Sequence, residues 1–378
     1  MRLSVFALAL AATVAVAVAV SGCTTLAVPS PSPTPVPVPV AKSKIGLFTV
    51  GPVEPTGTPI VIASGLTTPW SIVRLPSGSA LVSERDTALI KEIMADGTVR
   101  EVATVGGVVP GGEGGLLGIE VAGTVLFAYF TSSTDNRIVK FALLGDAGTY
   151  SLGAGIPILT GLVKAATHNG GRIKVGPDGM LYATVGDTRL PDAPQDLASA
   201  NGKILRMTLD GKVPADNPFP GSYVYSFGHR NPQGIAWDRE GQLWESELGQ
   251  NTWDELNRIT PGGNYGWPIV EGIAGNPAFI DPILQWSTDT ASPSGLAFTR
   301  DTLFMAALRG KRLWAIYPDP AGATAIASPW FTGVYGRIRD AIPGPDGSLW
   351  IATTNTDQNG TPVEGDDRIL QIELTPVG

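Results

Sequence analysis

Hydrophobic and polar positions alternate along most of the chain, and the alternation recurs in short units. Four segments share a Gly-containing turn, then alternating apolar residues, then a polar end: PSGSALVSERD (76–86), PDGMLYATVGD (177–187), REGQLWESELG (239–249) and PDGSLWIATTN (345–355). Two looser copies are VAGTVLFAYFT (121–131) and TRDTLFMAALRG (299–310). Such turns are typical of β-hairpins, and a period of two is that of a β-strand. The pattern predicts six β-units.

These units recur roughly every 45–60 residues, a repeat length that is typical of propellers. We therefore expect an all-β protein, a six-bladed β-propeller, with a β-sandwich that has recurring turns as the alternative. Equivalent strand ends of a propeller meet on one face. Here they carry polar side chains, which predict a polar site at the channel mouth; a solvated rim is the simpler interpretation. The side chains are those of Glu84, Arg85, Asp86, Asp187, Glu247, Arg309 and Asn355.

The first residues follow a different pattern. Arg2 precedes an apolar run that extends to Val20, and the sequence VSGC ends at Cys23, the one cysteine of the chain. A charged start, an apolar segment and small residues predict an export signal over 1–22. The residues before Cys23 resemble a bacterial lipobox, which implies that this cysteine is lipidated. An uncleaved membrane anchor is the alternative.

The segment 23–42 is rich in alternating proline, which predicts an extended tether. The folded domain is then expected over 43–378, exported and lipid-anchored at the outer face of the cell membrane. The net charge of −8 and the lack of a basic stripe argue against a nucleic-acid partner. A single cysteine excludes an intramolecular disulfide bond.

Several longer strings add a resemblance to a known family. They are LTTPWSIVRLPSG, GEGGLLGIE, HNGGRIKVGPDGMLYATVGD, GHRNPQGIAWD, ELGQNTWDELNRITPGGNYGWP and GRIRDAIPGPDG, in this order. Together, from about Ile60 to Ile372, they resemble the soluble-type pyrroloquinoline quinone (PQQ) glucose/aldose sugar dehydrogenases. The resemblance implies a six-bladed propeller that oxidises an aldose at C1 to the lactone with PQQ and Ca²⁺. The chain has no C-x-x-C-H haem motif, so electrons are expected to leave to an external acceptor, a quinone or a redox protein.

The chain has two histidines, His168 and His229. The family's general base matches His168, and its orienting carboxylate matches Asp187. A neutral imidazole is suited to accept a hydroxyl proton near pH 7, and a carboxylate on its other nitrogen fixes the tautomer. The resemblance places Arg230 at the quinone oxygens, where negative charge develops. A turn-capping role is the alternative for His168, and His229 is expected to be structural.

Other positions match the cofactor-binding residues of the family. Arg337 and Arg339, two residues apart in GRIRD, lie on one strand face by spacing alone. The resemblance implies that they bind the carboxylates of PQQ together with Arg309, a position that is often lysine in the family; ordinary surface arginines are the alternative. The matching set is completed by Glu113, Asn231 and Thr290. The family can have glutamine at the position of Glu113, so a carboxylate there is expected to affect sugar preference.

The resemblance also implies calcium. The loop ELGQNTWDELN matches one whose backbone carbonyls, here those of Gly249 and Gln250, hold the ion that bridges to PQQ. Glu255 and the Tyr265 carbonyl match a second, structural calcium. A solvated acidic loop is the simpler interpretation of Asp254 and Glu255.

Two other functions remain open at this point. One is a carbohydrate- or protein-binding propeller without catalysis, which loss of His168 or Arg230 would have favoured. The other is a calcium-dependent lactonase, which needs carboxylate and amide ligands at the channel mouth. Glu84, Asp187 and Asn355 are the residues that such a site would use.

Overall fold

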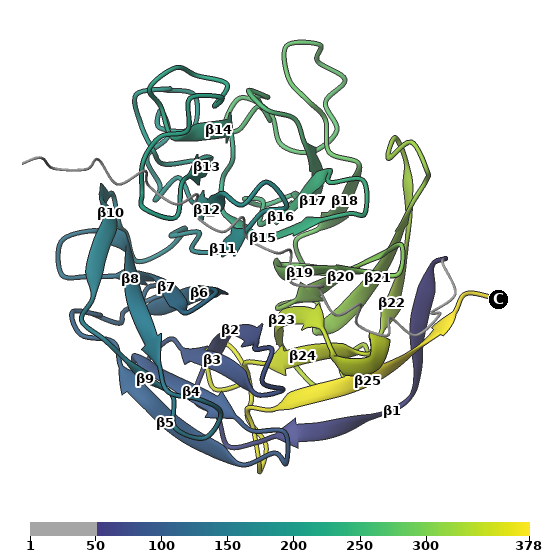
Figure 1. Ribbon diagram of the computed structural model, residues 1–378. Helices are drawn as coiled ribbons and strands as arrows, with labels where there is room; N and C mark the ends of the chain where they lie inside the picture. Colours follow the sequence, from purple (N-terminus) through teal and green to yellow (C-terminus); the bar gives the residue numbers. More distant parts are fainter. Residues whose placement is uncertain (1–50) are drawn as a thin grey trace, which may run out of the picture. The chain divides into compact units, whose positions relative to one another are not determined.

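The computed structural model describes residues 51–378, in which six antiparallel sheets are arranged in a ring (Figure 1). This confirms the predicted six-bladed β-propeller. The described residues contain no helix that is long and apolar enough to cross a membrane. The expected export signal, the lipidated Cys23 and the whole tether (23–42) lie outside the described residues.

The first five blades follow the chain in order. Blade 1 contains β2 (Pro69–Arg74), β3 (Ala80–Glu84), β4 (Leu89–Ile93) and β5 (Val99–Thr104). Blade 2 contains β6 (Leu116–Ala122), β7 (Val125–Thr131), β8 (Asn136–Leu144) and β10 (Ile156–Leu162), with β9 (Ser151–Leu152) paired to β8. Blade 3 contains β11 (Ile173–Val175), β12 (Leu181–Val185), β13 (Lys203–Met207) and β14 (Val224–Phe227). Blade 4 contains β15 (Pro232–Trp237), β16 (Leu243–Glu247), β17 (Trp253–Ile259) and β18 (Leu284–Ser287). Blade 5 contains β19 (Pro293–Thr299), β20 (Thr302–Ala307), β21 (Arg312–Pro318) and β22 (Ala325–Trp330).

Blade 6 is assembled from both ends of the described chain. It contains β23 (Ile338–Pro343), a 3₁₀ turn η1 (Pro345–Gly347), β24 (Leu349–Thr353) and β25 (Ile369–Pro376), and β1 (Val53–Ala63) adds the outer strand. β1 pairs antiparallel with β25 from Val53 opposite Pro376 to Ala63 opposite Ile369. This pairing closes the ring, as Figure 1 shows, with strands that are more than 300 residues apart in the sequence.

The sequence repeat coincides with the turn and second strand of each blade. In the four closest copies, the turn glycines Gly78, Gly179, Gly241 and Gly347 all have positive φ, which side-chain-bearing residues rarely adopt. The strands that follow, β3, β12, β16 and β24, are buried along their whole length. Both faces of these four strands are therefore covered.

The hydrophobic core lies between neighbouring blades. The cluster between blades 2 and 3, for example, joins Phe127 and Tyr129 of β7 to Leu181 of β12 and Leu205 of β13. Leu181 is fully buried, and truncation of such a leucine to alanine typically costs about 2–5 kcal/mol of folding free energy. This packing fixes the strand ends that carry the polar side chains.

Candidate active site

Two cavities lie where the second strands of the blades end. The first has a volume of about 670 Å³, and its lining includes Trp70, Arg85, Glu113, Arg309, Arg337 and Arg339. The second has a volume of about 490 Å³, and its lining includes His168, Asp187, Arg230, Gln250 and Trp267. A third cavity, lined by Asp238, Trp244 and Tyr317 among others, contains none of the predicted site residues. The first two cavities therefore define the candidate site.

His168 lies between an acid and a guanidinium. Its Nδ1 is 2.7 Å from Asp187 Oδ1, and its Nε2 is 3.0 Å from Arg230 Nη2. A carboxylate oxygen accepts and a guanidinium only donates, so both contacts select the tautomer with the proton on Nδ1. The Nε2 lone pair consequently faces the side on which Arg230 lies. The structure thus brings together the three residues that were predicted to be catalytic.

The backbone of His168 is held in a left-handed conformation, with φ of 59°. Its N–H donates to Glu113 Oε2 at 2.8 Å, and two residues later the N–H of Gly170 donates to Asn231 Oδ1 at 3.1 Å. A side chain at Gly186 would collide with the His168 carbonyl, so glycine is needed there. Glu113 and Asn231, both predicted to bind the cofactor, therefore support the loop that carries the histidine.

Asp187 also accepts a hydrogen bond from Trp267, a residue with no predicted role. Trp267 Nε1 donates to Asp187 Oδ2 at 2.8 Å. Burial raises the pKa of Asp187, but hydrogen bonds from His168, the Arg189 backbone and Trp267 outweigh it and leave the pKa below its usual value. The carboxylate is therefore charged and fixed in orientation. The string GGNYGWP contains Trp267 and was the only available signal.

Arg230 is held at its backbone and at its guanidinium group. Its N–H donates to Glu247 Oε2 at 2.6 Å, and Nη1 donates to the Leu248 carbonyl at 2.9 Å. The guanidinium also lies over the Trp267 ring, 5.5 Å from the centroid. Within residues 51–378 the buried Nε has no hydrogen-bond partner. Burial lowers the pKa of Arg230, and the nearby carboxylates, Asp187 first, oppose that shift.

The first cavity contains a pair of buried arginines on one carboxylate. Arg337 Nε is 2.9 Å from Asp357 Oδ2, and Arg339 Nη2 is 3.5 Å from the same oxygen. Arg339 Nη1 also donates to Gln233 Oε1 at 2.9 Å, whereas its Nε has no partner among the described residues. Burial lowers the pKa of Arg339 to about 9, although Asp357 counteracts it. Arg337 lies just before β23 and Arg339 lies within it, and both reach Asp357, a residue with no predicted role.

The other two predicted cofactor residues are less deeply placed. Arg309 lines the first cavity, but its side chain is 63% exposed and pairs with Asp289 at 2.5 Å. Thr290 does not line either cavity, and its Oγ1 donates to the Ser287 carbonyl at 3.0 Å. For both residues a role in cofactor binding stays a prediction.

Several polar residues at the strand ends support backbone instead of facing a cavity. Glu84 Oε1 accepts from the Thr67 N–H at 2.8 Å, and Asn355 Oδ1 accepts from the Arg337 N–H at 2.8 Å. Glu247 does the same for Arg230, as described above. Each contact holds the segment that enters the first strand of the blade. Because Glu84, Asp187 and Asn355 are committed to separate partners, their arrangement does not favour the ligand cluster of a lactonase.

The predicted calcium loop lies between β16 and β17. Gln250 lines the second cavity beside Arg230, and within residues 51–378 the carbonyls of Gly249 and Gln250 accept no hydrogen bond. A side chain at Gly249 would collide with the Trp253 carbonyl. Two carbonyls without partners beside a cavity provide oxygen atoms of the type that Ca²⁺ prefers.

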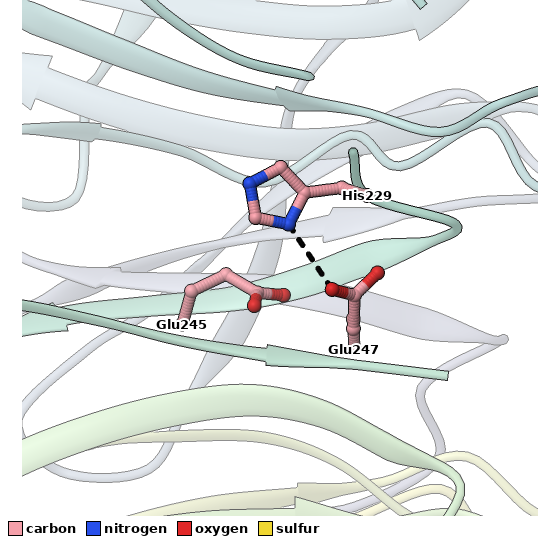
Figure 2. A group of neighbouring side chains, drawn as sticks. All are labelled: His229, Glu245 and Glu247. Atoms are coloured by element: carbon pink, nitrogen blue, oxygen red, sulfur yellow. Dashed lines mark hydrogen bonds and ion pairs between the residues drawn. The ribbon is translucent and has the colours of Figure 1, made fainter. Parts of the chain in front are cut away.

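The predicted second calcium region contains more carboxylates than the sequence analysis identified. Figure 2 shows Glu245 and Glu247 on β16 with His229 beside them, and one ligand atom from each lies within 4.8 Å of the others. Asn257 Nδ2 lies 3.1–3.3 Å from oxygens of Glu245, Glu247 and Glu255. Burial, followed by the Glu247 charge, raises the pKa of Glu245 well above its usual value and that of Glu255 to about 8.

His229 is fully buried within this cluster. Its Nδ1 is 3.0 Å from Glu247 Oε1, its Nε2 is 2.8 Å from Ser226 Oγ, and its ring stacks on Tyr265 at 4.8 Å. The histidine lines neither of the two cavities. This environment agrees with the structural role expected for it.

The chain is similar to known proteins in both sequence and fold. A family model described as Glucose / Sorbosone dehydrogenase matches residues 66–362. Quinoprotein glucose dehydrogenase B from Acinetobacter calcoaceticus is 34% identical over 253 residues, which cover 56% of this chain and 52% of that protein. The chain thus matches about half the length of that relative. Aldose sugar dehydrogenase YliI from Escherichia coli (strain K12) is 28% identical over 341 residues, which cover 78% of this chain and 89% of that protein.

A solved structure gives a closer likeness. The PQQ-bound form of aldose sugar dehydrogenase from Streptomyces coelicolor is 47% identical and superposes with a TM-score of 0.81. The match covers 85% of this chain and 100% of that one. The chain therefore belongs to the Glucose / Sorbosone dehydrogenase family.

Proposed function

We propose that the protein is a PQQ-dependent aldose dehydrogenase that oxidises C1 of a reducing sugar to the lactone. The observation that carries the proposal is the placement of His168 between Asp187 and Arg230 at the second cavity, together with the arginines that line the first cavity. The PQQ-bound relative from Streptomyces coelicolor supports the choice of cofactor.

His168 is the general base in this proposal. Its Nδ1–H stays with the charged Asp187, so Nε2 is the nitrogen that accepts the proton of the C1 hydroxyl. Asp187 then stabilises the imidazolium that forms. Because Nε2 has one lone pair, the incoming hydroxyl must replace Arg230 as its donor. The Arg230 guanidinium, no longer bonded to Nε2, can then stabilise the negative charge that develops beside it.

The residues of the first cavity fit an anionic cofactor. Arg337 and Arg339 share one carboxylate, Asp357, so the pair retains positive charge, and Arg339 Nε is a buried donor without a partner among the described residues. These donors would hold the carboxylates of PQQ, with Arg309 at the exposed edge. When bound, PQQ would supply the hydride acceptor, and Ca²⁺ would supply a Lewis acid.

The calcium ligands in the proposal are backbone and side-chain oxygens. The carbonyls of Gly249 and Gln250 would hold the ion at the second cavity. Glu255 and the Tyr265 carbonyl would hold a structural ion beside the buried Glu245 and Glu247. The buried carboxyl groups of Glu245, Glu247 and Glu255 surround the single amide of Asn257. A divalent cation would neutralise their negative charge.

The cellular setting follows from the N-terminal sequence. Export and lipidation of Cys23 would place the enzyme at the outer face of the cell membrane. The two electrons from the sugar would then pass to an external acceptor, a quinone or a redox protein. Globomycin, which blocks lipoprotein signal cleavage, should cause an unprocessed form of the protein to accumulate; unchanged processing would contradict this part of the proposal.

The reaction is tested with purified protein that has been freed of PQQ and Ca²⁺. Dye reduction is measured with a panel of aldoses, with neither additive, with each alone and with both. Activity that requires both additives is expected, and the panel ranks the sugars. A folded protein that binds PQQ but oxidises none of the aldoses would contradict the proposed function.

A further inference from the structure

A single carboxylate oxygen organises the loop that follows β16. Glu271 Oε1 accepts hydrogen bonds from the backbone N–H groups of four successive residues, at 2.7 Å from Gln250 and 3.2 Å from Asn251, Thr252 and Trp253. Successive N–H groups that converge on one anion form a nest, which fixes the backbone conformation. The four N–H groups all point toward Glu271, so the conformation of the loop depends on a side chain about twenty residues away.

Other contacts also hold the loop that follows β16. The Gly249 N–H donates to Asp254 Oδ1 at 2.9 Å, and a side chain at Gly249 would approach Glu271 Oε1 to 2.8 Å. Gly272, the next residue after Glu271, donates to Glu255 Oε1 at 2.7 Å. The segment around Glu271 therefore connects the two regions to which the proposed function assigns calcium.

We propose that Glu271 is a positioning residue for the cation loop. By engaging the N–H groups of 250–253, it holds the carbonyls of Gly249 and Gln250 ready to bind a hard divalent cation that Glu271 does not itself touch. This inference rests on the proposed function, because it takes the loop carbonyls as Ca²⁺ ligands. Residues that orient metal ligands typically change metal affinity by about 10–100-fold when they are substituted.

The test measures binding, not turnover. PQQ retained by the purified protein in equilibrium dialysis is recorded against free Ca²⁺ for wild type, Glu271→Gln, Glu271→Asp and Glu240→Gln. Glu271→Gln removes the charge, whereas Glu271→Asp keeps the charge but is too short to reach all four N–H groups. Glu240, an exposed residue on the same blade, is the matched control for loss of one negative charge.

We expect the Ca²⁺ midpoint to rise by about 10-fold or more in both Glu271 variants and to stay unchanged in Glu240→Gln. Saturating Ca²⁺ should restore full PQQ retention, and thermal unfolding without Ca²⁺ should show that the variants are folded. A wild-type midpoint in Glu271→Asp would overturn the inference, because the charge alone would then suffice, and so would wild-type midpoints in both variants. Ca²⁺-independent retention in wild type would instead contradict the assignment of calcium in the proposed function.

Discussion

The indole of Trp267 donates to Asp187 Oδ2 at 2.8 Å, the carboxylate oxygen that His168 does not use. Asp187 is therefore held from two sides, by the imidazole and by the indole. The same tryptophan ring lies under the Arg230 guanidinium. Trp267 thus contacts both residues that orient His168.

This relationship predicts the effect of Trp267→Phe. The substitution keeps an aromatic ring near Arg230 but removes the bond to Asp187. A hydrogen bond to a charged group contributes about 1.5–3 kcal/mol, and a loss of about 1.4 kcal/mol corresponds to tenfold in rate. We expect kcat to fall by about tenfold or more, measured by dye reduction at saturating aldose. Trp330→Phe is the control, since within the described chain its indole N–H has no partner; an equal loss in both variants would contradict a specific role.

The lowered pKa of Asp187 predicts a pH dependence of stability. A carboxyl whose pKa is lower in the folded than in the unfolded state stabilises the fold above its unfolded pKa. The contribution is lost as the pH falls through the folded pKa, which hydrogen bonding holds below the usual value for aspartate. The difference in unfolding free energy between wild type and Asp187→Asn, from urea titrations, should be larger at about pH 5 than at about pH 3. A difference that grows toward pH 3 would reverse the predicted sign.

The paired arginines of the first cavity predict the affinity for PQQ. Arg339→Gln removes a buried cation while Arg337 keeps its contact with Asp357. A contact with a charged group is worth about 1.5–3 kcal/mol, so PQQ should bind about 10–100-fold more weakly in equilibrium dialysis with saturating Ca²⁺. Arg239→Gln, in the third cavity, should leave PQQ binding unchanged. An unchanged dissociation constant in Arg339→Gln would exclude this arginine from the cofactor site.

The architecture was predictable because local signals repeat. Each close copy pairs a turn glycine of positive φ, such as Gly78 or Gly179, with a strand of period two, and six copies indicate a propeller. The closure of the ring by β1 could not be predicted from the sequence, because β1 carries no copy of the repeat and pairs with the far end of the chain.

Only part of the candidate site was predictable, for a similar reason. His168, Asp187 and Arg230 stand in distinctive strings, and Arg337 and Arg339 share a face through local spacing. Trp267 lies 80 residues from Asp187, and Asp357 lies 20 residues from Arg337, so only the folded chain shows these contacts. The sequence also does not show whether a polar residue at a strand end, such as Asn355, faces a cavity or holds the backbone.

The central claim is that His168 accepts the proton as the sugar is oxidised. The most direct measurement is anaerobic stopped-flow absorbance of the PQQ- and Ca²⁺-loaded protein mixed with excess aldose, without dye, for wild type and His168→Asn. A general base contributes about 10²–10⁴-fold, so the cofactor should be reduced rapidly in wild type and at least about 100-fold more slowly in the variant, with PQQ still bound. Equal rates of reduction in the two proteins would contradict the account.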